Sequence, residues 1–222
     1  MSRLFAISDI HGCFKPFFEL VTNSIKLTKA DQLFLLGDYI DRGQHSKEVI
    51  DFIIDLNKQG FNVTTLIGNH EVMLLDSYYN RELESIWMMN NGASTLMSFG
   101  IGDVRNIDKH YLEFLNSLEY YKVVGNVIFV HAGFNDQAIN PFSDIHSMIW
   151  ESRPSYRNTL LSGKTIIHGH RPNMISNLIR QIDEKASVIS IDTGCVYEKE
   201  MGYGILTAIE VNTMTLTSIP NY

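Results

Sequence analysis

Three short apolar runs in the first third of the chain each end in a cluster of polar residues and glycine. The clusters read SDIHG, GDYIDRG and IGNHE, and they follow runs over 4–8, 32–36 and 61–67. Each is followed by a longer segment with helical periodicity, over 14–27, 46–56 and 70–79. Strands and helices that alternate in this way form a parallel sheet with right-handed crossovers. The pattern therefore predicts such a sheet, with polar side chains where each strand ends.

The rest of the chain has a different pattern. Residues 82–118 mix Met, Asn, Gly and aromatic residues, which favours a helical cap or side layer. Strand patterns dominate the second half, over 122–124, 127–130, 165–167, 187–191, 205–211 and 215–219. Gly125 and Asn126 join the first two of these in a predicted hairpin. No linker or repeat interrupts the chain, so we expect one domain over 1–222, an α/β sandwich of mixed sheets flanked by helices.

Composition limits where such a protein works and what it contacts. The formal charge of −7 and the sequence pI near 5.6 argue against a general nucleic-acid or anionic-membrane surface, so we expect neither partner. Only Cys13 and Cys195 are present, too few for a disulfide framework, although a single bridge between them is left open. The N-terminus lacks a secretory pattern, and no run approaches the roughly 18 apolar residues of a membrane span. We expect a monomeric, soluble protein of the cytoplasm.

The strand ends are also where metal-ligating residue types gather. Two later strands end in histidines, His131 in FVHAG and His168 and His170 in IIHGH. Ligands bind beyond the carboxyl ends of parallel strands, so these clusters should meet in space. The convergent set is Asp9, His11, Asp38, Asn69, His70, His131 and one or both of His168 and His170.

This set suits divalent metal ions. Imidazole, carboxylate and amide oxygen without thiolate favour manganese, iron or zinc. Seven or eight side chains are too many for one ion. Two ions roughly 3.5–4 Å apart, bridged by one carboxylate, would use them and would clamp the attacking and leaving oxygens of an in-line displacement.

The motifs DIHG, GDYIDRG and GNHE, in this order, resemble those of the phosphoprotein phosphatase branch of the metallophosphoesterases. The short chain is most similar to bacterial and bacteriophage lambda-type serine/threonine phosphatases, from Asp9 to about Gly194. The resemblance implies a calcineurin-like β-sandwich and two divalent ions, manganese first, with iron or zinc as alternatives. It also implies hydrolysis of phosphoserine and phosphothreonine in proteins or peptides, extending to phosphotyrosine, by attack of a metal-bridging hydroxide.

The resemblance further implies a role for each motif residue. The first metal would be bound by Asp9 and His11, both metals by Asp38, and the second metal by Asn69, His131 and His170. The leaving alkoxide would be protonated by His70, oriented by Asp41, and the phosphate would be held by Arg42 and Arg153. Guanidinium groups match phosphate oxygens and stay charged, so they would supply the local cations that an acidic protein needs for a phosphate dianion.

Several assignments stay open at this stage. His168 and His170 compete for one metal position because a strand points both to the same side, and the family pattern favours His170. Arg153 lies in WESRP, which has one more residue before the arginine than the family pattern has. Asn69 could cap a helix as well as bind metal, and Asp192 could support a metal histidine or form a turn.

Two further segments also have alternative interpretations. The stretch over 87–100, WMMNNGASTLMSFG, could line a substrate groove, although core packing of a helical cap is the favoured interpretation. The insertion EKEM, Glu198 to Met201, could alter substrate access.

Other functions are also open. Symmetrical dinucleoside tetraphosphate hydrolases look similar, but they usually lack the aspartate of DRG and end the third motif in aspartate, so Asp41 and Glu71 favour the protein phosphatase. A phosphodiesterase could use the same metals. A non-catalytic scaffold of this fold should have lost metal ligands, whereas all six implied positions are present here.

Overall fold

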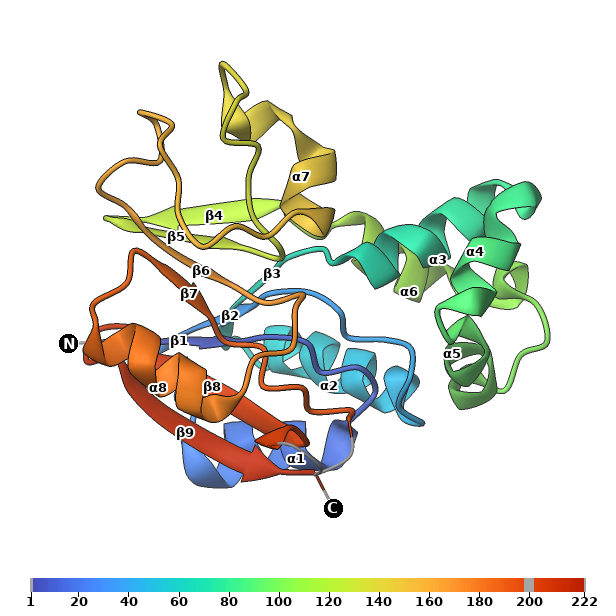
Figure 1. Ribbon diagram of the computed structural model, residues 1–222. Coiled ribbons are helices and arrows are strands. Elements are labelled where there is room, and N and C mark those ends of the chain that lie inside the picture. Colours follow the sequence, from blue (N-terminus) through green and yellow to red (C-terminus); the bar gives the residue numbers. More distant parts are fainter. Residues whose placement is uncertain (1, 198–201, 222) are drawn as a thin grey trace.

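The computed structural model describes residues 2–197 and 202–221 and contains two β-sheets with helices around them (Figure 1). The first sheet has five strands in the order β3-β2-β1-β8-β9. Its members are β1 (Leu4–Ile7), β2 (Gln32–Leu35), β3 (Asn62–Thr65), β8 (Ile205–Glu210) and β9 (Thr215–Pro220). The first three are parallel, as the alternation of strands and helices predicts, while β8 is antiparallel to β1 and to β9.

The second sheet has four strands in the order β4-β5-β6-β7. Its members are β4 (Tyr121–Val124), β5 (Val127–Val130), β6 (Thr165–His168) and β7 (Val188–Ser190). The hairpin between β4 and β5 turns at Gly125, which has a φ angle of 59°. Strand β4 is antiparallel to β5, whereas β5, β6 and β7 are parallel to one another. Both sheets are therefore mixed, and the predicted sandwich of mixed sheets is confirmed.

The two sheets pack through the side chains that face each other. Phe34 of β2 and Phe129 of β5 stack with ring centroids 4.1 Å apart, and Ala6 and Ile167 belong to the same buried cluster. Side chains alternate between the faces of a strand, so the neighbours of these residues point outward. On the first sheet those neighbours contact helices, and on the second they pack around Met148.

Helices follow the first three strands, as predicted. Helix α1 (Phe14–Glu19) continues as a π-helical turn to Ser24, and α2 (Ser46–Lys58) and α3 (Asn69–Tyr79) match their predicted segments. The predicted side layer consists of α4 (Glu84–Met89), α5 (Gly92–Phe99) and α6 (Lys109–Asn116), with single turns at Arg81–Leu83 and Val104–Asn106. Figure 1 shows α3 to α6 extending to one side of the sheets.

Two helices in the second half were not predicted from the sequence. Helix α7 (Ile145–Trp150) is preceded by a single turn at Pro141–Ser143 and is too short to show a periodic pattern. Helix α8 (Ile175–Asp183) does carry a signal, because Ile175, Leu178 and Ile182 recur at helical spacing and pack against the core between the sheets.

Three other expectations concern the two cysteines, the insertion after Tyr197 and membrane-spanning helices. Cys13 and Cys195 are both buried and both free thiols, so the bridge left open between them is absent. The insertion Glu198 to Met201 lies outside the described residues. Within the described part of the chain, no helix combines the length and the apolar composition needed to cross a bilayer.

Candidate metal centre

The predicted ligands gather beyond the carboxyl ends of five strands. Asp9 and His11 follow β1, Asp38 follows β2, and Asn69 and His70 begin α3 just after β3. His131 and His170 follow β5 and β6 of the other sheet. All are buried except His170, which is half-buried. The centre therefore lies where the two sheets meet.

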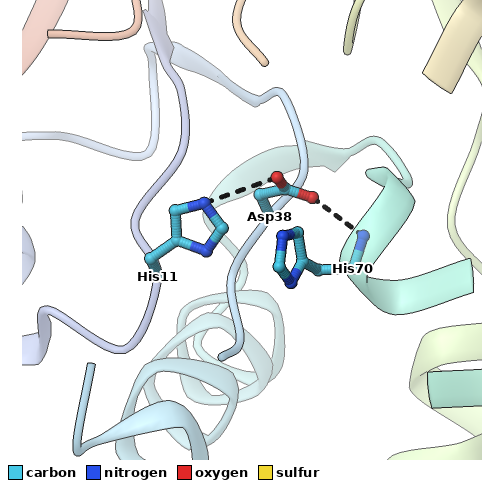
Figure 2. A group of neighbouring side chains, drawn as sticks. All are labelled: His11, Asp38 and His70. Atoms are coloured by element: carbon cyan, nitrogen blue, oxygen red, sulfur yellow. Dashed lines mark hydrogen bonds and ion pairs between the residues drawn. The ribbon is translucent and has the colours of Figure 1, made fainter. Parts of the chain in front are cut away.

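One group of candidate ligands is formed by His11, Asp38 and His70, whose ligand atoms all lie within 4.8 Å of one another (Figure 2). His11 Nε2 lies 3.5 Å from Asp38 Oδ2. The backbone N–H of His70 donates to Asp38 Oδ1 at 3.1 Å, which fixes the carboxylate against the start of α3.

A second group is formed by Asp38, His131 and His170, within the same distance limit. His131 Nε2 lies 3.6 Å from Asp38 Oδ1, and both His131 Nε2 and His170 Nδ1 lie 3.0 Å from Asn69 Oδ1. Asp38 thus belongs to both groups, with Oδ2 facing His11 and Oδ1 facing His131. This is the placement that a bridging carboxylate requires.

Backbone carbonyls orient two of the histidines. The Leu36 carbonyl lies 2.9 Å from His131 Nδ1, and the Ile40 carbonyl lies 2.8 Å from His11 Nδ1. A carbonyl can only accept, so each Nδ1 carries the proton and each Nε2 presents a lone pair to the centre. Burial lowers the pKa of His11 well below its usual value and that of His170 to about 3, so both rings are neutral.

The chemistry of these groups fits a bound cation. Lone pairs of Asn69, His131 and His170 converge within 3.2 Å of one another. Burial, reinforced by the charges of Asp9 and Glu71, raises the pKa of Asp38 well above its usual value. A divalent ion would offset this concentration of lone pairs and negative charge. Nitrogen and oxygen donors without sulfur suit manganese, iron or zinc.

Asp9 and His168 lie beside these groups. The Asp9 carboxylate accepts from the backbone N–H of His170 at 3.0 and 3.2 Å and contacts the Ser8 hydroxyl, but it is outside both groups of three. His168 is buried with Nδ1 2.9 Å from the Gly169 carbonyl, and burial lowers its pKa to about 4. Of the two competing histidines, the structure thus brings His170 to the centre.

Asp41 and His70 form a buried pair next to the ligands. His70 Nδ1 lies 2.7 Å from Asp41 Oδ2, and both side chains are almost completely enclosed. Burial lowers the pKa of His70, but Asp38 and Asp41 outweigh it and leave that pKa raised. His70 Nε2 is buried with no hydrogen-bond partner in the described structure, so the protein leaves its hydrogen-bonding capacity unused.

The two arginines have different positions. Arg42 is half-buried at the centre, where Nη1 donates to His11 Nε2 at 2.7 Å and the guanidinium lies 5.6 Å from the Tyr197 ring. Arg42 therefore occupies the His11 lone pair that the resemblance assigned to a metal. Arg153 is exposed and pairs with Glu151 at 3.4 Å. Among the described residues it makes no hydrogen bond to the predicted ligands.

The backbone at the centre adopts a conformation that L-residues rarely take. Six of the ten described non-glycine residues with positive φ belong to the predicted site: Asp9, His11, Asp38, Asp41, Arg42 and His170. Such conformations are disfavoured and persist where the surrounding structure enforces them, often at functional sites. Gly68 contributes in another way, because a Cβ there would overlap the Asp38 carboxylate.

Sequence reasoning missed the structural role of Glu71. This fully buried carboxylate accepts backbone N–H groups of Asp38 and Gly68 at 2.8 and 3.0 Å, and of Tyr39 and Ile40 at 2.8 and 3.3 Å. It therefore shapes the loop that carries the bridging aspartate. Its position three residues after Gly68 could have indicated only the local contact to the Gly68 N–H, which is one half of a capping box; the contacts to residues 38–40 have no local signal.

Two open assignments are decided by hydrogen bonds. The residue that caps α3 is Gly68, so the interpretation of Asn69 as a helix cap was wrong, and its side-chain oxygen instead faces two histidines. Asp192 accepts from the backbone N–H of Gly194 at 2.9 Å, as a turn residue does, and none of its described hydrogen bonds reaches a candidate ligand histidine.

Comparison with known proteins places the chain among phosphoesterases. The sequence pattern of the family described as calcineurin-like phosphoesterase matches residues 2–190. A symmetrical bis(5'-nucleosyl)-tetraphosphatase of Buchnera aphidicola is 27% identical over 184 residues, which are 77% of this chain and 58% of the relative. The chain thus spans just over half the length of that relative. An asymmetrical bis(5'-nucleosyl)-tetraphosphatase of Anoxybacillus flavithermus is 24% identical, with 97% of this chain and 93% of the relative covered.

Solved structures share the fold. A protein described as a candidate diadenosine tetraphosphatase superposes with a TM-score of 0.69 at 19% identity, covering 100% of this chain and 94% of that one. A serine/threonine protein phosphatase from Saccharomyces cerevisiae superposes with a TM-score of 0.68 at 13% identity, covering 100% and 80%. At these identities the likeness concerns the fold alone.

Proposed function

The chain belongs to the calcineurin-like phosphoesterase family, and on that premise we propose that it is a metal-dependent hydrolase of dinucleoside tetraphosphates. The observation that carries the substrate class is the similarity to an asymmetrical bis(5'-nucleosyl)-tetraphosphatase, which extends over nearly the full length of both chains. The comparisons favour this alternative over the protein phosphatase that the motifs first indicated.

Divalent ions would be held by Asp9, His11, Asp38, Asn69, His131 and His170, which leaves His70 as the proton donor. When bound, such ions activate water and neutralise the charge of the phosphate under attack. We assign manganese first, with iron or zinc as alternatives. Arg42, at the edge of the centre, would add a fixed positive charge for the polyphosphate, whose anions would otherwise be repelled by an acidic protein.

A cavity beside Arg42 offers room for a nucleoside. It has a volume of about 570 Å³ and is lined by Arg42, Gln44, His45, Glu48, Ser94, Met97 and Ser98. That volume is within the range of small-molecule sites, and among the residues named as its lining only Met97 is apolar. In our proposal the cavity receives one base and ribose while the polyphosphate extends past Arg42 to the metal centre.

One observation favours a second candidate, hydrolysis of phosphoserine and phosphothreonine in proteins. The buried pair of Asp41 and His70 leaves His70 Nε2 free to donate a proton. An alkoxide needs such a proton far more than a departing phosphate does, because it is the stronger base. The pair therefore suits a phosphomonoester with a poor leaving group.

The test uses metal-stripped protein with and without added manganese. Diadenosine tetraphosphate, a phosphoserine peptide and a phosphotyrosine peptide are incubated separately, and the products are resolved by anion-exchange chromatography. We expect manganese-dependent cleavage of the dinucleotide, to two ADP if cleavage is symmetrical or to ATP and AMP if it is asymmetrical. Turnover of the peptides alone would replace this proposal with the protein phosphatase. No turnover of any substrate would instead support a non-catalytic scaffold.

A further inference from the structure

The Asp41 carboxylate binds two side chains that come from the helical side layer. Trp87 Nε1 donates to Asp41 Oδ2 at 2.8 Å, and the Thr95 hydroxyl donates to Asp41 Oδ1 at 2.6 Å. His70 Nδ1 shares Oδ2 with Trp87, at 2.7 Å. All four side chains are at most 1% exposed, so no water competes for these bonds.

Thr95 also fixes the backbone of Asp41. Its hydroxyl oxygen accepts from the Asp41 backbone N–H at 2.9 Å while its proton goes to the Asp41 carboxylate. Ser46, at the start of α2, lies 3.1 Å from both the Asp41 backbone nitrogen and the Thr95 hydroxyl. Asp41 is one of the residues with a positive φ, 69°, and these contacts stabilise that conformation.

Helices α4 and α5 close around the Trp87 ring to make this contact. The chain reverses between them at Asn91, which has a left-handed conformation with φ of 68°. Gly92 begins α5 directly over the indole, and a Cβ there would overlap the ring. The segment 87–100 thus does more than pack in the core or line a groove, because its buried polar side chains Trp87 and Thr95 both donate hydrogen bonds to the Asp41 carboxylate.

We propose that Trp87 and Thr95 are positioning residues for proton donation by His70. The inference rests on the second candidate function, in which water adds to the phosphorus of a phosphomonoester, the bond from phosphorus to the leaving alkoxide oxygen breaks, and that oxygen takes the proton from His70 Nε2. A proton from the attacking water restores His70. With its two oxygens held by Trp87 and Thr95, Asp41 cannot rotate, and His70 keeps Nε2 directed at the leaving oxygen.

This arrangement predicts a dependence on the leaving group that a structural role would not produce. Phenyl phosphate has a basic leaving group that needs the proton, whereas 4-nitrophenyl phosphate has a stable one that does not. General acid catalysis contributes typically 10²–10⁴-fold. We expect Trp87→Phe and Thr95→Val to lower kcat roughly tenfold for phenyl phosphate and by less than about threefold for 4-nitrophenyl phosphate, with KM and metal content unchanged.

Three variants make the result specific. Thr95→Ser retains the hydroxyl and should restore the native ratio of the two rates. Leu96→Ala removes packing from the same helix without touching Asp41, so it should lower stability and leave the ratio unchanged. His70→Asn is the reference, because it should show the full leaving-group effect.

The reference variant separates the role of His70 from the roles of Trp87 and Thr95. If His70→Asn alters the ratio but Trp87→Phe and Thr95→Val do not, the positioning inference is overturned and the role of His70 stands. If His70→Asn leaves the ratio unchanged, the proposed proton donor is wrong, and this inference fails with it.

Proton NMR provides a readout that needs no turnover. The hydrogen-bonded Nδ1 proton of His70 should give a downfield resonance that is missing in His70→Asn. We expect that resonance to be broadened or shifted upfield in Trp87→Phe and preserved in Leu96→Ala. A resonance unchanged in both Trp87→Phe and Thr95→Val would contradict the inference.

Discussion

The buried carboxylate of Glu71 allows a sharp test of how the metal-centre loop is held. Two of its acceptor contacts come from Asp38 and Gly68, and two from Tyr39 and Ile40. Burial raises the pKa of the Glu71 carboxyl, and the backbone N–H groups of Tyr39 and Asp38 lower it in return. With donors on both oxygens, the carboxyl has no acceptor nearby for a proton of its own.

In Glu71→Gln, one oxygen becomes an NH₂ group that faces two N–H donors. Two hydrogen bonds to a charged acceptor are lost, each contributing about 1.5–3 kcal/mol, and each donor left buried and unpaired costs about 1–3 kcal/mol. Because these two terms overlap, we expect a loss of about 3–5 kcal/mol in the free energy of unfolding. Total stabilities are roughly 5–15 kcal/mol, so the loss is a large fraction.

Urea denaturation of the metal-stripped protein, followed by far-UV circular dichroism, measures this loss without a contribution from bound ions. The matched control is Glu113→Gln on α6, where Glu113 is exposed and pairs with Lys109 at 3.2 Å. It should change stability by less than about 0.5 kcal/mol. A loss below about 1 kcal/mol for Glu71→Gln would refute the view that this carboxylate organises the loop.

Three further predictions concern metal binding and acid stability. Asp38→Asn should retain the native circular dichroism spectrum but lose bound manganese in elemental analysis, because one carboxylate faces both ligand groups; full metal content would exclude the bridging role. Gly68→Ala should also reduce bound manganese, since its Cβ would displace the Asp38 carboxylate, and native content would show that the loop adapts. Asp31 lies 2.6 Å from Arg3, which lowers the pKa of the Asp31 carboxyl. The ion pair's contribution to the free energy of unfolding is therefore complete above about pH 4 and is lost as the pH falls below that value. Asp31→Asn should therefore lower the free energy of unfolding by about 1–2 kcal/mol at pH 7 and by less at pH 3, and equal losses in urea titrations at both pH values would contradict this.

Much of the fold could be predicted because its signals are local. Continuous apolar runs in strands such as β1 and β5 indicate strands that are buried on both faces, and Gly125 marks the turn between β4 and β5. The order of strands and helices then requires that polar residues at the strand ends converge. For this reason the sequence alone named the side chains that line the centre.

Other features depend on where the chain turns after an element ends. His168 and His170 looked equivalent along an extended strand, but β6 ends at His168, and His170 has a φ of 71° that turns it toward Asn69. Arg153, predicted at the phosphate, is exposed beside Glu151 instead. Such turns depend on packing between segments that have no common local pattern.

The sequence by itself determined the sheets, the helices that follow the first three strands, and the identity of the candidate ligands. Only the tertiary structure decided what holds them in place. Glu71 reaches the backbone of residues 31 to 33 positions earlier in the chain, and Trp87 and Thr95 reach Asp41 across 46 and 54 positions. Hydrogen bonds over such separations form only when several helices and strands pack together, and no periodicity within one segment encodes them.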